Sequence, residues 1–389
     1  MIKENGKYRV LMSLYWMLFC VGYGYVTYFL VNWNFSASEV GIITAVFGVL
    51  AALLQPLLGK LADRGGALGW KPLLLFMSTG ALLIMISLYF LHAKIWIGIF
   101  YGLFLMLLSA MMPLVNAANF YYQNQGKKIN FGVARGLGSL GYAAVSMLLG
   151  KWTALFGVEA VSLSGIVLGA MFVGAVFMMP YDSQVVEKEK EKETSQKKGD
   201  LEFFRRYPAF TMMLVGCVGL LTFHNVVCTY LLQVMETLGG NSTDMGTALA
   251  ISAVIELPVM FGFSYLSKKI SAGNLLVISG VSFVIKGILY LLAGNVWWIY
   301  GAQIFQMTSF ALFASASVYY ADECMGAEDK VKGQAYMSMT ITMGAVIGNL
   351  IGGWILEGFG VSAMLIVAIL VAVIGTIIIL NAVKKRQMS

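Results

Sequence analysis

Uninterrupted apolar stretches of about 20 residues recur along the whole chain, and they constrain its fold more than any other feature. A helix of that length crosses the hydrocarbon core of a bilayer, which is about 30 Å thick. Of the 389 residues, 59% are hydrophobic and 12% are charged, whereas a soluble domain has about 25% charged residues. A soluble core cannot bury so much apolar surface. The sequence therefore excludes a soluble enzyme, a disordered chain, a collagen and a coiled coil.

Polar breaks divide the chain into twelve candidate spans. Backbone polar groups at bilayer depth must be satisfied within the segment, which favours helices, and a membrane β-barrel would show shorter segments of alternating polarity. The sequence thus predicts an all-α membrane protein with twelve transmembrane helices. The predicted spans are 9–31, 39–61, 73–91, 95–121, 131–150, 158–180, 209–235, 245–267, 274–293, 296–320, 333–354 and 360–383.

The basic residues indicate how these spans are oriented. With the N-terminus in the cytoplasm, 22 of the 26 Lys and Arg residues lie in cytoplasmic segments, and only Lys94 and Lys151 lie in outer loops. This is the distribution that the positive-inside rule expects. We predict a multi-pass plasma-membrane protein with both termini in the cytoplasm, in the inner membrane of a bacterium. The same placement explains the net charge of +7 without a nucleic-acid partner.

A charged segment at 181–208 divides the spans into two sets of six. Its alternating Glu and Lys residues are typical of a solvated linker. Glycines four residues apart occur in both the fifth and the eleventh span, at Gly132 and Gly136 and at Gly344 and Gly348. We therefore predict two six-helix pseudo-repeat bundles, 1–180 and 209–389, around a central cavity, with 181–208 as a cytoplasmic linker.

The loop after the second span contains Gly59, Asp63 and Arg64 in the pattern Gly-x-x-x-Asp-Arg. With the span count and the linker, this pattern resembles the major facilitator superfamily over essentially the whole chain. The resemblance implies that these three residues form a gating motif, in which the aspartate and the arginine belong to a cytoplasmic charge network. An ordinary loop turn is the alternative for this segment.

Ionisable residues deep within predicted spans are the strongest functional signal, because charges in hydrocarbon are costly and usually functional. Glu256 and Lys286 both lie about 18 Å from the cytoplasmic edge, and His224 about 22 Å, at a rise of about 1.5 Å per residue. Glu256 would carry the proton, and Lys286 would favour its release. The alternatives are a structural ion pair for Glu256 and Lys286 and a core hydrogen bond for His224.

Candidate solute-binding residues come from several spans. Arg135 and Tyr142 are seven residues apart, so that a guanidinium and an aromatic ring share one helix face and suit a polar ring. For Arg135, the alternative is that its side chain snorkels to the membrane surface. The first predicted span also contains tyrosines, for which packing or an interface belt is the alternative to solute binding: Tyr15, Tyr23, Tyr25 and Tyr28. The further candidates are Asn116, Asn119, Gln55, Tyr23 and Gln306.

The segment from Phe131 to Tyr142 resembles the fifth span of the oligosaccharide and nucleoside proton symporters, the lactose-permease side of the superfamily. The resemblance implies that Arg135 contacts substrate, that Tyr142 stacks on it, and that Glu256 is the eighth-span glutamate. Lys286 stands where lactose permease has an arginine. The chain departs from that permease at Asn116, Gln306 and Ser309, which replace acidic and histidine positions.

We therefore expect a transporter, not an enzyme, that imports a small polar solute such as a sugar or nucleoside with protons. It would need no cofactor beyond the proton gradient, no metal and no nucleic acid, and would work as a monomer in the lipid bilayer. Two buried bases and one buried acid leave an excess positive charge within the spans, which would attract a carboxylate. A permease for an aromatic or other organic acid, of the phenylpropionate type, is therefore the alternative. A drug exporter and a non-transporting receptor are weaker alternatives, because deep carboxylates are few and no large soluble domain is present.

Overall fold

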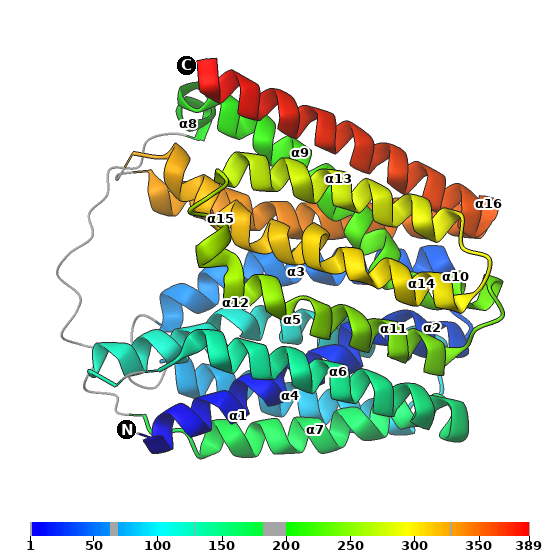
Figure 1. Cartoon of the computed structure of the whole chain (residues 1–389). Helices are drawn as coiled ribbons and strands as arrows, with labels where there is room; N and C mark the ends of the chain where they lie inside the picture. Colours follow the sequence, from blue (N-terminus) through cyan, green and yellow to red (C-terminus); the bar gives the residue numbers. More distant parts are fainter. Residues whose placement is uncertain (1, 63–68, 128, 182–199, 327–328, 389) are drawn as a thin grey trace. The chain divides into compact units, whose positions relative to one another are not determined.

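The computed structural model describes residues 2–62, 69–127, 129–181, 200–326 and 329–388, and within these ranges every regular element is a helix (Figure 1). The helices group into two compact units. Unit 1 comprises the described residues of 1–193 and 241–254, and unit 2 those of 194–240 and 255–389. Of the predicted linker, 182–199 lie outside the described residues, and Asp200–Arg206 form the short helix α8.

In unit 1, α1 packs against α5, α6 and α7, and α4 packs against α5 and α7 (Figure 1). The elements of unit 1 are α1 (Ile2–Phe19), η1 (Cys20–Gly24), α2 (Val26–Asn32), α3 (Ala37–Ala62), α4 (Trp70–Phe90), α5 (Lys94–Asn124), α6 (Phe131–Phe156), α7 (Glu159–Phe177) and α11, whose bounds are Ser242–Ile255.

The first-span tyrosines join this span to its neighbours. Tyr15 donates to the carbonyl of Leu108 (2.8 Å), and Tyr25 donates to that of Ser146 (2.6 Å). Both tyrosine side chains are fully buried. Tyr15 and Tyr25 therefore pack between helices and satisfy buried carbonyl groups.

Helices α6 and α11 touch through their backbones. A Cβ atom on Gly246 would lie 2.2 Å from the carbonyl oxygen of Ser146, and one on Gly150 would lie 2.8 Å from that of Ser242. Only glycine permits this approach at both positions. The hydroxyls of Ser242 and Thr243 also donate to the carbonyl of Gly150, at 3.4 and 3.2 Å. Although it follows the linker in sequence, α11 is thus bound to unit 1.

In unit 2, α16 packs closely along α9, and α13 contacts α16, α15 and the irregular segment η5. The elements of unit 2 are α8, α9 (Pro208–Thr229), α10 (Leu231–Thr237), α12 (Leu257–Leu266), α13 (Ala272–Leu291), α14 (Val296–Ala302), η4 (Gln303–Gln306), η5 (Met307–Ala311), α15 (Leu312–Cys324) and α16 (Lys330–Met388). The long α16 consists of two helices that meet at Gly360, whose φ of 80° lies in the left-handed region.

Three predicted spans are interrupted near their middles. In the first, the π-helical η1 separates α1 from α2, and the two parts are bent by 45°. In the eighth, α11 ends at Ile255 and α12 begins at Leu257, because the ring of Pro258 removes the amide that would bond to Val254 and clashes with its carbonyl. The sequence analysis treated these spans as continuous, so the interruptions correct that expectation.

The tenth span has no proline to interrupt it. Its 3₁₀ segment η4 and π-helical segment η5 lie between α14 and α15. Ser279 of α13 donates to the carbonyl of Ser309 at 2.7 Å, and this bond from a neighbouring helix satisfies a carbonyl within the irregular segment. Local 3₁₀ and π turns are frequent at functional sites.

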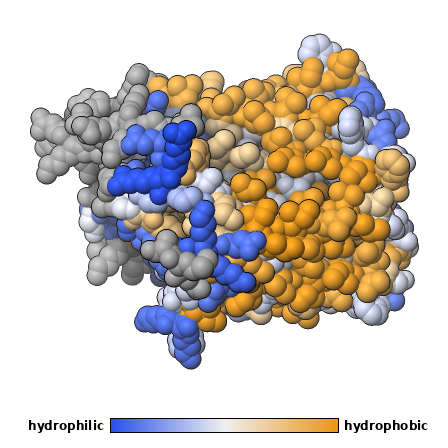
Figure 2. Space-filling model, turned by 90° about the horizontal axis from the view of Figure 1, so that it is seen from above, coloured by the Kyte–Doolittle hydropathy of each residue, from blue (hydrophilic) through white to orange (hydrophobic). Residues whose placement is uncertain are grey.

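The surface of the helices is largely apolar. Within the described ranges, nine helices are long and apolar enough to span a membrane, or ten when the bent first pair is taken as one span. Large apolar side chains such as Leu53, Phe76 and Trp354 are at least 70% exposed. Figure 2 shows hydrophobic residues over much of the visible face, with hydrophilic residues gathered toward its ends. Such a surface requires a bilayer, because water would not tolerate it.

Candidate functional site

Three polar side chains of unit 2 form a hydrogen-bonded chain. The Nζ atom of Lys286 donates to Oε1 of Gln306 at 2.6 Å, and Nε2 of Gln306 donates to Oε1 of Glu256 at 2.9 Å. Lys286 and Gln306 are each 3% exposed, and Glu256 is half-buried. The structure therefore brings an acid and a base together through one amide, within otherwise apolar helices.

Each member of this chain occupies a distinct backbone setting. Glu256 lies at the break between α11 and α12, and Gln306 lies at the junction of η4 and η5. Lys286 lies on the regular helix α13. Two of the three residues therefore occupy positions where the regular α-helical pattern is interrupted. The equal depths estimated for Glu256 and Lys286 agree with this arrangement.

His224 of α9 lies near this chain within unit 2. Its ring stacks on Phe310 with centroids 4.1 Å apart and an interplanar angle of 6°. Its ring nitrogens lie 3.7 and 3.8 Å from the sulfur of Cys228, one turn later. Lys286 is within electrostatic range of both His224 and Cys228. His224 is thus part of the same polar neighbourhood, although it is held mainly by aromatic contacts.

In unit 1, the side chain of Arg135 lies against the first span. Its Nη1 donates to the hydroxyl of Ser139 at 2.7 Å, and its Cζ lies 3.8 Å from the centre of the Trp16 ring. Arg135 and Trp16 are both half-buried. The flat guanidinium and indole groups therefore stack, a contact that stabilises both side chains. Trp16 was not among the predicted site residues.

Trp16 begins a row of aromatic rings along the first span. Its ring centre lies 5.2 Å from that of Phe19, and Phe19 stacks on Tyr23 at 4.6 Å. These three residues are half-buried, whereas Tyr15, Leu18 and Val21 beside them are buried. We call Trp16, Phe19 and Tyr23 the aromatic row. The spacing of three and four residues already indicated a shared helix face.

A polar cluster marks the far end of the aromatic row. The Tyr23 hydroxyl lies 2.6 Å from that of Ser109 on α5, and Gln55 of α3 donates to the backbone carbonyl of Ser109 at 3.0 Å. Two predicted residues, Tyr23 and Gln55, therefore meet at Ser109. The sequence analysis missed Ser109, because a serine in an apolar span is common and gives no distinct signal.

The remaining predicted residues of unit 1 are less closely associated. Asn119 is buried and accepts a hydrogen bond from Gln123 at 3.3 Å, whereas Asn116 is half-buried on the same helix. Tyr142 packs against a small apolar cluster of Ala143, Ala250 and Ala253. It shares α6 with Arg135. For Arg135, the observed ring partner is Trp16.

The predicted gating motif is only partly described. Gly59 lies in α3, and among the described residues no atom outside its own stretch of helix backbone comes within 4 Å of the position that a Cβ atom would occupy. Asp63 and Arg64 lie outside the described residues.

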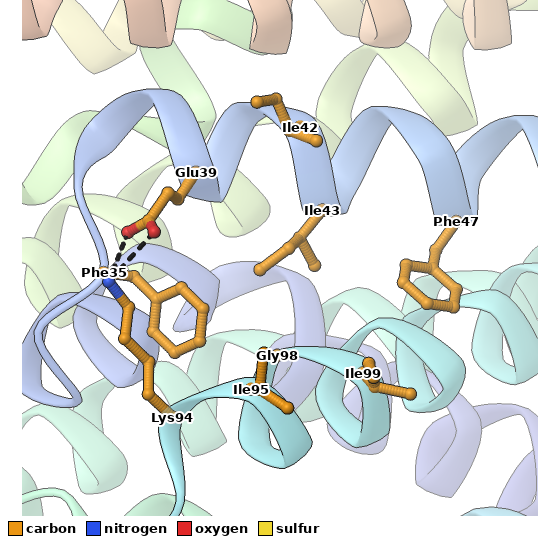
Figure 3. Close-up of a pocket in the computed structure, with 9 residues that line it drawn as sticks. All are labelled: Phe35, Glu39, Ile42, Ile43, Phe47, Lys94, Ile95, Gly98 and Ile99. Carbon is orange, nitrogen blue, oxygen red and sulfur yellow. Dashed lines mark hydrogen bonds and ion pairs between the residues drawn. The ribbon is translucent and has the colours of Figure 1, made fainter.

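A pocket of about 500 Å³ lies between the first halves of α3 and α5 (Figure 3). Its lining is mostly apolar, including Ile42, Phe47 and Ile99. Lys94 and Glu39 form an ion pair of 2.7 Å at one end. None of the predicted polar residues lines this pocket. An apolar groove with its two charges already paired does not suit a polar solute, so the candidate site is better defined by the polar chain and the aromatic row.

Comparison with known proteins gives consistent matches along the chain. Residues 7–380 match the model of the MFS_1 like family. The chain is 23% identical to the uncharacterized transporter YwbF of Bacillus subtilis (strain 168), over 82% of this chain and 76% of that one. It is 22% identical to the maltose permease of Geobacillus stearothermophilus, over 90% and 87% of the two chains.

Solved structures show the same fold. The nucleoside transporter NupG matches with a TM-score of 0.81 and 15% identity, covering 98% of each chain. A bacterial homolog of the lysosomal transporter Spinster matches with a TM-score of 0.69 and 12% identity, over 98% and 96% of the two chains. Since the family model covers nearly the whole chain, this protein belongs to the MFS_1 like family and is a transporter of the major facilitator superfamily.

Proposed function

We propose that this transporter is a proton-coupled symporter of a neutral polar solute, of the nucleoside or sugar type, that works by alternating access. The observation that carries the proposal is the chain from Lys286 through Gln306 to Glu256. A carboxylate and an ammonium group in a membrane-spanning region are costly, and such pairs commonly serve ion or proton movement. No cofactor is needed, because the proton gradient supplies about 2.3 kcal/mol per charge per 100 mV.

Glu256 is the proton carrier in this proposal. Its carboxylate accepts a proton from the aqueous side when the site opens outward, and releases it when the site opens inward. Desolvation favours the protonated form, and the hydrogen-bonded connection to Lys286 favours the ionised form. A movement that alters either influence changes the proton affinity. His224, near Lys286, is proposed to tune this balance.

The solute is proposed to bind at the aromatic row and Arg135. Half-buried rings at Trp16, Phe19 and Tyr23 offer flat apolar faces, and Arg135 supplies hydrogen-bond donors beside them. Flat bases and sugar rings both present an apolar face and a polar edge to such a surface. The proteins that this chain resembles support the same classes of solute, since one is a nucleoside transporter and another is a maltose permease. Asn116, Asn119, Gln55 and Tyr142 are proposed to complete the polar lining.

The finer architecture also remains our proposal: twelve spans in two six-helix bundles around a central cavity, with both termini in the cytoplasm of a bacterial cell. Two observations support a count of twelve membrane spans. Gly360 divides α16 into two helices, and α14 to α15 form an interrupted segment of spanning length. Added to the ten spans counted by length and hydropathy, these give twelve. Gly59, Asp63 and Arg64 are proposed to form the cytoplasmic gating motif.

A permease for an organic acid is the second candidate. Arg135 and Lys286 outnumber Glu256 among the charges deep within the predicted spans. A carboxylate solute would balance that excess.

The test is uptake into proteoliposomes at two external pH values, with uridine, maltose and 3-phenylpropionate as separate probes. We expect uridine or maltose to accumulate against its gradient when the outside is acidic, and Glu256→Gln to abolish this accumulation while solute binding persists. The change leaves a neutral amide of nearly the same shape. Undiminished accumulation in that variant would refute the carrier role of Glu256. Accumulation of 3-phenylpropionate alone would favour the second candidate.

A further inference from the structure

The amide of Gln306 has a fixed orientation, and this has a consequence for proton coupling. The ammonium group of Lys286 has donors only, so the group 2.6 Å from it must be the amide oxygen. The amide NH₂ group must then face Glu256, 2.9 Å away. As long as Lys286 holds the oxygen, Gln306 donates to Glu256 and stabilises its carboxylate.

We infer that Gln306 is a positioning residue that couples the location of Lys286 to the protonation of Glu256. When its amide rotates by half a turn, the Glu256 carboxylate takes up a proton from the aqueous side, and the reverse rotation favours release of that proton to water. The inference rests on the proposed proton symport. When Lys286 moves away, the amide oxygen is released and can turn toward Glu256. It then accepts a hydrogen bond from the protonated carboxyl, which an NH₂ group cannot do. The two amide orientations match the two protonation states of the carrier.

The backbone around Gln306 supports this role. It is the last residue of the 3₁₀ segment η4 and directly precedes the π-helical η5, so it lies outside both α-helices of its span, α14 and α15. Its side chain is 3% exposed. Water therefore has little access to replace the amide, and the hydrogen-bonded connection between base and acid depends on this side chain.

The surrounding charged and titratable groups of unit 2 are few. Besides Lys286, α13 supplies Tyr290, whose ring centre lies 5.6 Å from Nζ, and α9 supplies His224 and Cys228. The segments η4 and η5 contain no Asp, Glu, Lys, Arg or His, and α12 contains only Tyr265 among titratable residues. In α15, the titratable residues are Tyr319, Tyr320, Asp322, Glu323 and Cys324, in its second half.

Gln303 provides a matched control. It lies three residues earlier in the same irregular segment, is 2% exposed, and donates to the Tyr290 hydroxyl at 2.9 Å. The two side chains have the same chemistry and burial, but the hydrogen bond described for Gln303 is to Tyr290 and not to Lys286 or Glu256. Gln303→Met therefore reproduces the loss of a buried amide without removing the connection to Glu256.

The test measures the titration of Glu256 without any solute. Purified protein in liposomes is titrated by infrared difference spectroscopy, and the carbonyl band of the protonated carboxyl that disappears in Glu256→Gln is assigned to Glu256. In Gln306→Met the donor to the carboxylate is lost, so the midpoint of this band should move to higher pH by about one unit or more. Gln303→Met should titrate like the wild type.

A second variant protects the test against a folding defect. Gln306→Glu keeps the size and the acceptor for Lys286 but places a second acid beside Glu256. One proton must then be shared, so the onset of protonation should also move to higher pH. Midpoints unchanged from wild type in both folded variants would overturn the role of Gln306. An equal shift in Gln303→Met would do so as well.

The proposed symport fails differently. If Glu256→Gln still accumulates solute, proton coupling through Glu256 is wrong, whatever the spectra of the Gln306 variants. If Glu256→Gln abolishes accumulation but the midpoint of the Glu256 titration is unchanged in the Gln306 variants, Glu256 is still supported as the proton carrier. Only the role inferred for Gln306 is then wrong.

Discussion

At the scale of single residues, the notable pairing is that of Arg135 with Trp16. The guanidinium lies over the indole, with Cζ 3.8 Å from the ring centre, and it donates to Ser139, so two contacts hold it without any solute. A preorganised donor loses less conformational entropy on binding than a mobile one. The contact therefore supports the role proposed for Arg135 in solute binding.

We expect Arg135→Lys to weaken solute binding about tenfold, even though the positive charge remains. Lysine has neither the planar face that stacks on Trp16 nor the forked donors. The measurement is the concentration of uridine or maltose at half-maximal uptake, with exchange activity as the control for folding. An unchanged half-saturation concentration would instead assign Arg135 to the surface, as a snorkelling residue.

The polar residues of the candidate site could be picked out from the sequence, but their contacts could not. Glu256 and Lys286 stood out because charges are rare in apolar spans, and their positions along those spans indicated a shared depth. Gln306 was predicted to bind solute, and its place between the acid and the base depends on a backbone irregularity that hydropathy does not encode. Trp16 looked like one more aromatic residue, since only the packing of α1 on α6 brings it under Arg135.

At the scale of elements, the predicted spans were located well and their interiors were not. The fifth span begins at 131 as predicted, and α6 extends beyond its predicted end at 150 to Phe156. The apolar pattern indicates which segments lie in lipid. Because an interrupted helix in lipid is as apolar as a continuous one, the pattern does not show where a helix is interrupted. Pro258 was visible in the sequence, but prolines also occur at Pro56 and Pro113 within α3 and α5, where the helix continues. Proline alone therefore does not identify a break.

Pro258→Ala should raise the melting temperature and slow transport several-fold. The substitution restores an amide donor for the Val254 carbonyl and removes the steric clash, which favours a continuous helix. A straightened helix would move Glu256 away from Gln306. The measurements are thermal unfolding in detergent and the initial rate of uptake.

Pro56→Ala is the matched control, because α3 is already continuous at that position. It should leave the transport rate unchanged. Transport at the wild-type rate in Pro258→Ala would show that the break has no part in the mechanism.

At the scale of the whole molecule, the orientation in the membrane remains a prediction from charge. The 22 basic residues assigned to the cytoplasm include both ends of the chain, and Lys94 is the last residue of an outer loop in the same scheme. Even numbers of spans place both termini on one side, so the topology depends on the two spans that α16 contributes.

Reporter fusions test this topology. A green fluorescent protein fused after residue 389 should fluoresce, and alkaline phosphatase fused after Lys94 should be active, because the first folds in the cytoplasm and the second outside it. Phosphatase activity at the C-terminus would mean either an odd number of spans or an inverted orientation, and either would contradict the proposed architecture.

The interruption at Glu256 has a mechanical consequence. The chain passes from unit 1 to unit 2 between Val254 and Ile255, two residues before this carboxyl group. The residue proposed to carry the proton therefore lies just after the point where the chain leaves unit 1, at the end of a helix that close backbone contacts at Gly150 and Gly246 hold against α6. In the proposed symport, the gain or loss of a proton by Glu256 would act directly beside this passage of the chain.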